Sequence, residues 1–329
     1  MKKFSFSHLN KPLLIAEIGN NHEGSFKRAK KLIDLAKQAG ADAVKFQTIN
    51  PEKFHHQDEK KQLKKYHKFK LSDHQFQKLS SYSKKKNLLF ISTPFDLKSA
   101  RFLRGIVDII KISSGDNNFI PLIDICIKFK KPTIISTGLL TEKEIYKLYN
   151  YLKDKIDIKK LCFLHCVASY PVDPKDANIS FIKRLKKKLP NIVIGYSDHT
   201  VGPYASILAS SIGSMVIEKH FTDDKNFSNF KDHFLSADKE ELTLISQFLK
   251  NQNIYLGKGK KVKLEKEEKK NYNNLRRSIY ATKNIKKNEI LNENNISILR
   301  PFKKNNIKNY KKIVNKKSKK NYLSGELIS

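Results

Sequence analysis

The stretch IVIGYSDHTVGPYASILASSIGSMVIEKH (192–220) contains two short apolar runs joined by a helical segment. The runs 192–198 and 214–220 are rich in Val and Ile, which favours buried β-strands, whereas 202–212 has helical spacing of its apolar residues. Parallel strands need a long crossover connection, usually a helix. The stretch therefore predicts one βαβ unit of an α/β fold.

Apolar runs of this kind continue from residue 220 back to the N-terminus. The eight runs are LLIAEIG (13–19), DAVKFQT (42–48), LLFIST (88–93), DIIKISS (108–114), TIIST (133–137), LCFLHC (161–166), IVIGYSD (192–198) and SMVIEKH (214–220). Helices are predicted at 25–40, 73–86, 97–104, 119–129, 142–153, 179–189, 202–212 and 238–250. This alternation favours a (β/α)8 TIM barrel, which takes about 250 residues, over an open doubly wound sheet.

The first predicted helix, 25–40, has its own start and stop signals. Ser25 is a suitable N-cap, apolar residues recur behind it at helical spacing, and Gly40 is suited to the C-terminal end. The segment is therefore expected to pack one apolar face against the barrel.

Polar residues stand at the C-terminal side of nearly every predicted strand. Glu17, Lys45, Lys111, His165 and His220 are examples, and a buried strand has no structural need for them. Active sites of (β/α)8 barrels are built from these strand ends. We therefore expect one convergent polar site there.

The pattern changes near residue 255. We predict a barrel at 1–255, an exposed charged linker at 256–275 and a small, mostly β domain at 276–329, where short β-like runs are broken by Asn and Lys turns.

The chain is strongly basic, with 66 Lys and Arg against 32 Asp and Glu and a net charge of +34. Only seven of these cations are arginine and they accompany many Asn and Ile, as A/T-biased coding would produce. A nucleic-acid surface usually shows a localised stripe with Arg and aromatic residues. The spread of lysines along the chain favours a compositional origin, and no nucleic-acid partner is expected.

Other features set expectations about location. No stretch approaches the roughly 20 apolar residues of a membrane helix, and the N-terminus lacks the apolar region of a signal peptide. Three cysteines suit free thiols in a reducing compartment. We expect a cytoplasmic protein without a membrane partner. The lysine-rich segment with His55, His56 and His67 is interpreted as a solvated loop.

Two histidines follow successive predicted strands, His199 in YSDHT and His220 in EKHF. Neighbouring strands lie about 4.8 Å apart, so the two imidazoles can bind one divalent ion. In a closed barrel the last strand also neighbours the first, which brings Glu17 beside His220. The alternative is that both are ordinary hydrogen-bonded histidines.

A second set of residues suits an anion. Lysines directed into a barrel mouth are costly to desolvate unless an anion meets them, and serine hydroxyls supply further donors. The set is Lys45, Lys111, Ser114, Ser136 and Ser197. It predicts a phosphate or carboxylate ligand, and the alternative is that the lysines lie on the surface.

The motifs EIGNNHEGS, AVKFQT, ISTPFD, KISSGD, ISTGL, LHCVASYP, GYSDHT, EKHFT, RRSIYATKNIKKNEIL and ILRP together resemble those of the sialic acid synthases and their legionaminic and pseudaminic acid synthase relatives. The resemblance implies a barrel joined to an antifreeze-like (SAF) domain in a domain-swapped homodimer. It also implies condensation of phosphoenolpyruvate with an N-acylated mannosamine-type sugar. The implied metal is Mn2+, with Mg2+ or Co2+ as alternatives.

The resemblance assigns roles to residues of this chain. It implies that His199 and His220 hold the metal and that Glu17 orients the aldehyde or handles a proton. The lysines and serines of the anion set match the phosphoenolpyruvate site. Sugar contacts are implied for Gln47, Thr93, Asp116 and Tyr170, and Arg300 would extend from the small domain into the partner's barrel.

Three departures from the family pattern concern the acceptor side. Asp116 stands where the sialic acid enzymes carry Glu, Ala168 stands where they carry Asn, and FSNFKDH (227–233) replaces a P-G-P-D segment, which leaves Asp232 as the acidic equivalent. The identity of the sugar is therefore open. The rival hypotheses are a related synthase with a different, for example phosphorylated, acceptor, a barrel that binds acidic sugars without turnover, and a nucleic-acid-binding protein.

Overall fold

The computed structural model describes residues 4–257, 259–304 and 307–328. The chain forms two compact units, Met1–Leu256 and Gly257–Ser329. No helix in the described part of the chain combines the length and apolarity that a membrane span requires.

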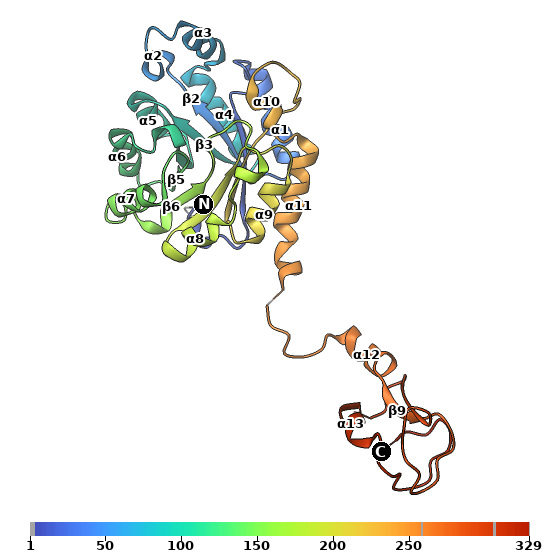
Figure 1. The fold of residues 1–329 in the computed structure, drawn as a ribbon. Helices are drawn as coiled ribbons and strands as arrows, with labels where there is room; N and C mark the ends of the chain where they lie inside the picture. The colour runs from blue at the N-terminus through green and yellow to red at the C-terminus, as the bar shows by residue number, and fades with distance from the viewer. Residues whose placement is uncertain (1–3, 258, 305–306, 329) are drawn as a thin grey trace. The chain divides into compact units, whose positions relative to one another are not determined.

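The first unit is a closed barrel of eight parallel strands in sequence order, which confirms the predicted fold class (Figure 1). The strands are β1 (Leu13–Gly19), β2 (Ala43–Thr48), β3 (Leu89–Pro94), β4 (Ile109–Ile112), β5 (Thr133–Ser136), β6 (Leu161–His165), β7 (Val193–Asp198) and β8 (Val216–His220). β8 pairs with β1, and Glu17 lies opposite His220 in the register. The predicted neighbourhood of these two residues is therefore correct.

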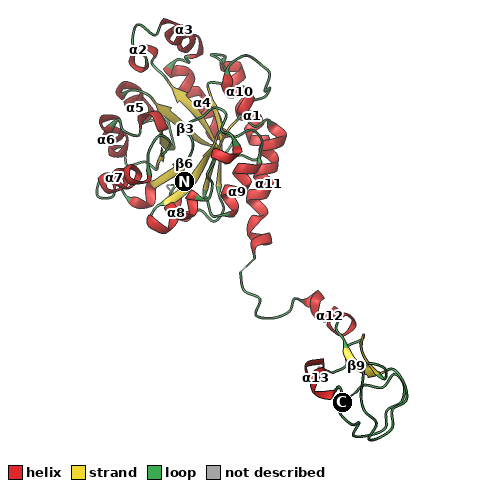
Figure 2. Cartoon of the chain, viewed as in Figure 1, coloured by secondary structure: helices red, strands yellow, loops and turns green. Residues whose placement is uncertain are grey.

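Helices surround the strands (Figure 2). They are α1 (Phe26–Gln38), α2 (Pro51–Phe54), α3 (Lys60–Phe69), α4 (Asp73–Lys85), α5 (Leu97–Leu103), α6 (Ile120–Lys128), α7 (Glu142–Leu152), α8 (Phe181–Lys188), α9 (Tyr204–Ser211), α10 (Lys231–Leu235) and α11 (Lys239–Leu256). Each predicted helix has an observed counterpart. The interpretation of the segment with His55, His56 and His67 as a loop is wrong in part, because α2 and α3 form there. His56 and His67 are exposed, as expected, and His55 is half-buried.

α1 forms for the reasons that its sequence suggests. The Ser25 hydroxyl accepts a hydrogen bond from Arg28 N, and the buried face consists of apolar residues such as Leu32 and Ile33. Gly40 has a φ of +86°, a conformation that favours glycine at a helix end.

The barrel interior changes character along its axis. At the N-terminal end it is apolar, and Phe6 packs there against residues such as Ile15, Ile91 and Ile134. Gly195 is required by close packing, since a Cβ there would lie 2.6 Å from Val216 O. The polar side chains gather at the opposite end, where the strands finish.

The second unit has its own small core, which includes Ile279, Ile285 and Ile296. It contains the antiparallel strands β9 (Ser278–Ala281) and β10 (Ile296–Leu299) and the helices α12 (Lys266–Leu275) and α13 (Tyr310–Ile313). α12 occupies the second half of the predicted charged linker 256–275, and none of its residues is buried. Its assignment as an antifreeze-like domain stays a prediction.

Candidate active site

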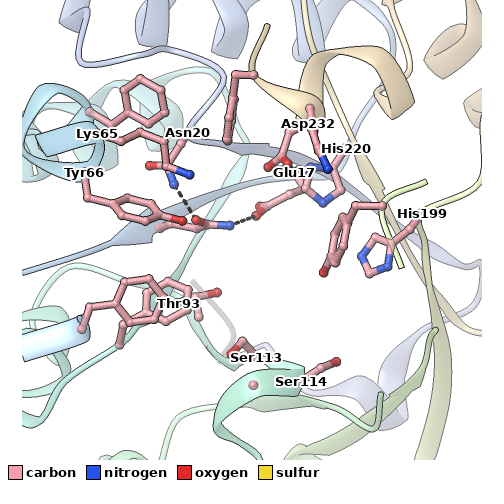
Figure 3. Close-up of a pocket in the computed structure, with 18 of the residues that line it drawn as sticks. Glu17, Asn20, Lys65, Tyr66, Thr93, Ser113, Ser114, His199, His220 and Asp232 are labelled. Carbon is pink, nitrogen blue, oxygen red and sulfur yellow. Dashed lines mark hydrogen bonds and ion pairs between the residues drawn. The ribbon is translucent and has the colours of Figure 1, made fainter. Parts of the chain in front are cut away.

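A pocket of about 1270 Å³ opens at the C-terminal ends of the barrel strands (Figure 3). The predicted residues that line it are Glu17, Lys45, Gln47, Thr93, Lys111, Ser114, Asp116, Ser136, Tyr170, Ser197, His199, His220 and Asp232. Arg300 belongs to the second unit, where its Nε donates to Leu275 O. The structure thus brings together these barrel residues from segments far apart in the chain. The expectation that His165 joins them is wrong, because it does not line this pocket and its Nε2 pairs with Ala177 O.

Four buried charges form the floor of the pocket. Lys45 Nζ lies 2.8 Å from Glu17 Oε1 and 3.6 Å from Glu218 Oε1, while Lys111 Nζ lies 3.8 Å from Glu218 Oε1. Glu218 stands at the end of its strand, where polar residues were expected, but no role was predicted for it. It shares strand parity with His220, and this signal indicates that both face the pocket, because alternate strand residues face the same side.

Burial changes the proton affinity of these groups. It raises the pKa of the Glu17 carboxyl to about 7, although Lys45 beside it acts in the opposite direction. Burial also lowers the pKa of Lys111, against the attraction of Glu218. Lys111 is 3% exposed, and its Nζ donates to Ser136 Oγ at 2.7 Å. Lys111 is thus a buried cation whose nearest hydrogen-bond partner is neutral, an arrangement that suits an incoming anion.

The two imidazoles lie side by side, with ring centroids 5.5 Å apart. His199 Nδ1 donates to Val167 O at 2.8 Å, so Nε2 carries the lone pair, and Nε2 lies 3.4 Å from Ser197 Oγ. His220 Nδ1 is buried without a hydrogen-bond partner and lies 3.7 Å from Asp232 Oδ2. Burial lowers the pKa of both rings, so both are neutral, which is the form that binds metals.

The residues fit a metal that keeps open positions. Within the described ranges, no group of three or more His, Cys, Asp and Glu side chains is arranged to hold a metal ion. The chain offers two neutral imidazoles, one with an unpaired buried nitrogen, so further ligands would come from substrate or water. Metal binding stays a prediction.

Amides and aromatic rings line other parts of the pocket. Asn20 Nδ2 donates to Gln47 Oε1 at 2.6 Å, and Gln47 Nε2 donates to Glu17 Oε1 at 3.3 Å (Figure 3). The Tyr170 ring lies 4.3 Å from that of His199, centroid to centroid. Thr93 Oγ1 is buried without a partner, which leaves it available to a ligand.

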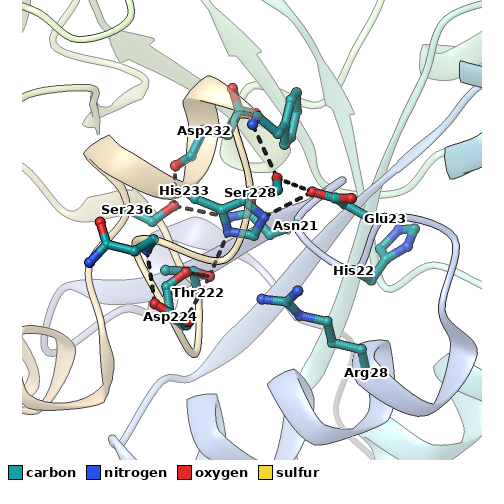
Figure 4. A network of polar contacts seen from close by, with 12 residues as sticks. Asn21, His22, Glu23, Arg28, Thr222, Asp224, Ser228, Asp232, His233 and Ser236 are labelled. Carbon is teal, nitrogen blue, oxygen red and sulfur yellow. Dashed lines mark hydrogen bonds and ion pairs between the residues drawn. The ribbon is translucent and has the colours of Figure 1, made fainter. Parts of the chain in front are cut away.

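α10, which carries Asp232, and the residues before it are anchored to the loop after β1 (Figure 4). Ser228 Oγ donates to Glu23, and His233 Nε2 lies 3.4 Å from the same carboxylate. His233 Nδ1 also lies 2.8 Å from Thr222 Oγ1. Burial raises the pKa of Asp232 to about 6. These contacts hold Asp232 at the pocket wall, and sequence reasoning had no signal for them.

A further buried ion pair is formed by Asp198 and Lys219, the residues that directly precede the two histidines. Lys219 Nζ lies 3.2 Å from Asp198 Oδ2, and both side chains are fully buried. Asp198 also accepts from Ser206 Oγ at 2.7 Å. Asp198 and Lys219 are register partners on β7 and β8, and each directly precedes one of the histidines. The pair therefore joins the two strand ends that present the imidazoles.

Lys219→Met is expected to lower the free energy of unfolding of the barrel by about 3–5 kcal/mol, because it leaves the Asp198 carboxylate buried and unpaired. Denaturant unfolding measures the change. The matched control is Lys225→Met, whose partners Asp238 and Glu241 are partly exposed, so its effect should stay below about 1 kcal/mol. Equal losses in the two variants would contradict this role of the pair.

The closed barrel and its polar pocket define a (β/α)8-barrel protein of the kind that carries its active site at the strand ends. Residues 32–261 match the NeuB family, and the chain belongs to that family.

Several relatives are similar along nearly the whole chain. An uncharacterised protein of Methanocaldococcus jannaschii is 40% identical over 96% of this chain and 92% of its own length. The N,N'-diacetyllegionaminic acid synthase of Campylobacter jejuni is 36% identical over 97% of this chain and 99% of its own length. Family membership makes the chain an enzyme of the nonulosonic acid synthase group, which confirms the predicted transferase class.

A solved structure agrees with this placement. The N-acetylneuraminic acid synthetase of Leptospira borgpetersenii, crystallised with citrate, superposes with a TM-score of 0.74 at 35% identity, covering 79% of this chain and 90% of that one. This relative and the one from Campylobacter are named for different products, so the similarity does not identify the acceptor of this chain.

Proposed function

We propose that this enzyme condenses phosphoenolpyruvate with an N-acylated mannosamine-type aldose, giving a nine-carbon 2-keto acid and phosphate. One observation carries the proposal: a buried cation, Lys111, lies in the same pocket as two neutral imidazoles. Ser114, Ser136 and Ser197 add hydroxyl donors around it. This combination suits a phosphate ester beside a polarised carbonyl.

The proposed reaction has two bond-forming steps. C3 of phosphoenolpyruvate attacks the aldehyde carbon of the open-chain sugar, and the resulting alkoxide takes a proton. The oxygen of one water adds at C2 and loses one proton, which leaves a hydroxyl on C2. The bond from C2 to the bridging oxygen then breaks, and the remaining hydroxyl proton passes to the departing phosphate. Phosphate leaves with this oxygen and C2 becomes the ketone. Lys45 and Lys111 are assigned to the anionic groups of phosphoenolpyruvate.

His199 and His220 would hold a divalent ion, with Mn2+ proposed and Mg2+ or Co2+ as alternatives. When bound, such an ion supplies Lewis acidity towards a carbonyl oxygen. Val167 O fixes the tautomer of His199 through Nδ1, so that Nε2 keeps a lone pair with which it could bind a metal.

Glu17 is assigned as the proton donor to the alkoxide. Its Oε2 is buried without a partner and can carry the proton, because burial raises its pKa to about 7. A carboxylic acid must be protonated to donate, so we expect kcat to fall as the pH rises above about 7. Glu17→Gln should lower kcat and remove this pH dependence. A variant profile that keeps the same decline would assign the titration to another group.

The acceptor is proposed to contact Gln47, Thr93, Asp116, Tyr170 and Asp232. Arg300 is proposed to reach the acceptor's N-acyl group within a domain-swapped homodimer.

Release of inorganic phosphate tests the proposed reaction. Purified enzyme should release phosphate from phosphoenolpyruvate only when an N-acylated aldose and a divalent metal are both present. Release without the aldose would indicate a phosphatase, and no release with any aldose would indicate binding without turnover.

A further inference from the structure

A carboxylate lies inside the site proposed for the anionic groups of phosphoenolpyruvate. Glu218 Oε1 lies 3.6 Å from Lys45 Nζ and 3.8 Å from Lys111 Nζ, and the side chain is buried. A negative charge at this place repels the anion that the two lysines are proposed to bind. Glu218 is therefore explained either by balancing the buried lysines or by a part in the reaction itself.

The two oxygens of this carboxylate differ in their contacts. Oε1 faces both lysines and accepts a hydrogen bond from Ser197 Oγ at 2.9 Å. Oε2 is buried and has no hydrogen-bond partner among the described residues. Balancing the lysines needs only Oε1, and burying an unpaired acceptor is costly. Oε2 is therefore a spare acceptor on a residue that lines the pocket.

Glu218 lies deeper in the barrel than the imidazoles. Glu218 and His220 are alternate residues of β8, so both side chains point inwards, and Glu218 lies about 6.6 Å nearer the N-terminal end of the barrel. Glu17 is the register partner of His220. The two carboxylates thus stand at different levels, Glu17 beside the imidazoles (Figure 3) and Glu218 below them, near both lysines.

These two levels match two separate needs of the proposed reaction. C2 of phosphoenolpyruvate bears both the carboxylate and the bridging oxygen of the phosphate. If Lys45 and Lys111 each bind one of these groups, C2 lies between the two ammonium groups, where Glu218 also lies. The alkoxide that takes a proton forms at the aldehyde carbon instead, near the imidazoles and Glu17. Glu218 is therefore the carboxylate placed to contact a water beside C2.

We infer that Glu218 Oε2 accepts a hydrogen bond from the water that adds at C2 and so directs the oxygen of this water towards that carbon. The inference rests on the proposed function and adds a catalytic residue to it. A lone pair of the water forms the new bond to C2. The electrons of the double bond between C2 and the bridging oxygen, which exists once C3 has attacked, return to that oxygen. The proton of the water is then lost as in the proposed reaction.

Glu218→Gln tests the inference with a change that preserves the shape of the side chain. The amide oxygen can keep the contacts of Oε1 with Ser197 and the lysines, which places a nitrogen donor where Oε2 lies. This donor cannot accept a hydrogen bond from water, so we expect kcat to fall by about a hundred-fold or more. The Kd for phosphoenolpyruvate, measured by calorimetry without the aldose, should stay the same or decrease, because one repelling charge is removed.

Glu218→Asp separates the position of the acceptor from its charge. The variant keeps the negative charge but withdraws the oxygens by about 1.5 Å, the length of one C–C bond, so kcat should fall by about tenfold or more. The control Glu241→Gln makes the same amide replacement outside the pocket, in a carboxylate that lies 2.7 Å from Lys225, and it should match the wild type.

Two results would overturn the inference. A kcat within about threefold of the wild type in Glu218→Gln would show that Glu218 only balances the lysines. A Kd for phosphoenolpyruvate raised by about tenfold or more in that variant would show that Glu218 acts through the lysines instead of the water. Failure of the wild-type enzyme to turn over any N-acylated aldose would count against the proposed function itself.

Discussion

Replacing His199 or His220 with alanine is expected to lower kcat by about a thousand-fold or more while the barrel stays folded. The expectation follows from chemistry: loss of carbonyl polarisation costs several kcal/mol of transition-state stabilisation, and about 4 kcal/mol corresponds to a thousand-fold. Both rings are buried and neutral, so each presents a nitrogen lone pair instead of a charge. Steady-state kinetics measures the loss of kcat, and titration calorimetry with Mn2+ measures the accompanying loss of metal affinity.

The control for this prediction is His165→Ala. His165 is also buried, but its Nε2 pairs with Ala177 O at 3.0 Å and it does not line the pocket. Its replacement should cost stability and leave kcat per folded molecule within a few-fold of the wild type. Full activity after exhaustive chelation, or alanine variants of His199 and His220 that keep more than a tenth of kcat, would refute the metal assignment.

Lys111→Met is expected to raise the KM for phosphoenolpyruvate by about a hundred-fold or more and to change the KM for the acceptor little. Removing one member of a buried, hydrogen-bonded charge contact costs about 2–5 kcal/mol. Methionine has a side chain of similar length to lysine but carries no charge that could bind an anion. The substitution should therefore weaken binding of the substrate that carries the phosphate ester.

Lys131→Met provides the matched control for this change. Lys131 precedes β5 at the opposite end of the barrel, and its Nζ donates to Val107 O. This variant should bind phosphoenolpyruvate normally. A KM within threefold of the wild-type value in Lys111→Met would show that Lys111 does not contact phosphoenolpyruvate.

The barrel and the composition of its pocket could be predicted because both follow from local patterns. Each strand is a short Val- and Ile-rich run, and the polar residue at its end needs only the closed topology to reach the common site. The pairing of Glu17 with His220 followed from closure alone, and the register confirms it. Local capping likewise fixed the start of α1 at Ser25.

The features that were missed depend on long-range contacts. α3 is dominated by lysines, and only Leu63, Tyr66 and Phe69 form its short apolar face, so the composition indicated a loop. Aromatic packing of Phe69 on Phe230, from a segment far along the chain, holds the helix in place. The segment around Asp232 is likewise held by a distant residue, because Ser228 and His233 contact Glu23. Spacing within one segment carries no signal for such partners.

The mass of the product tests the central claim most directly. Enzyme incubated with phosphoenolpyruvate, Mn2+ and a panel of neutral and anionic N-acylated aldoses should form a new compound whose mass equals that of the two substrates plus one water minus one phosphoric acid, with one phosphate released for each molecule formed. Recovery of unchanged aldose alongside pyruvate and phosphate, or of a phosphorylated aldose alongside pyruvate, would contradict the account.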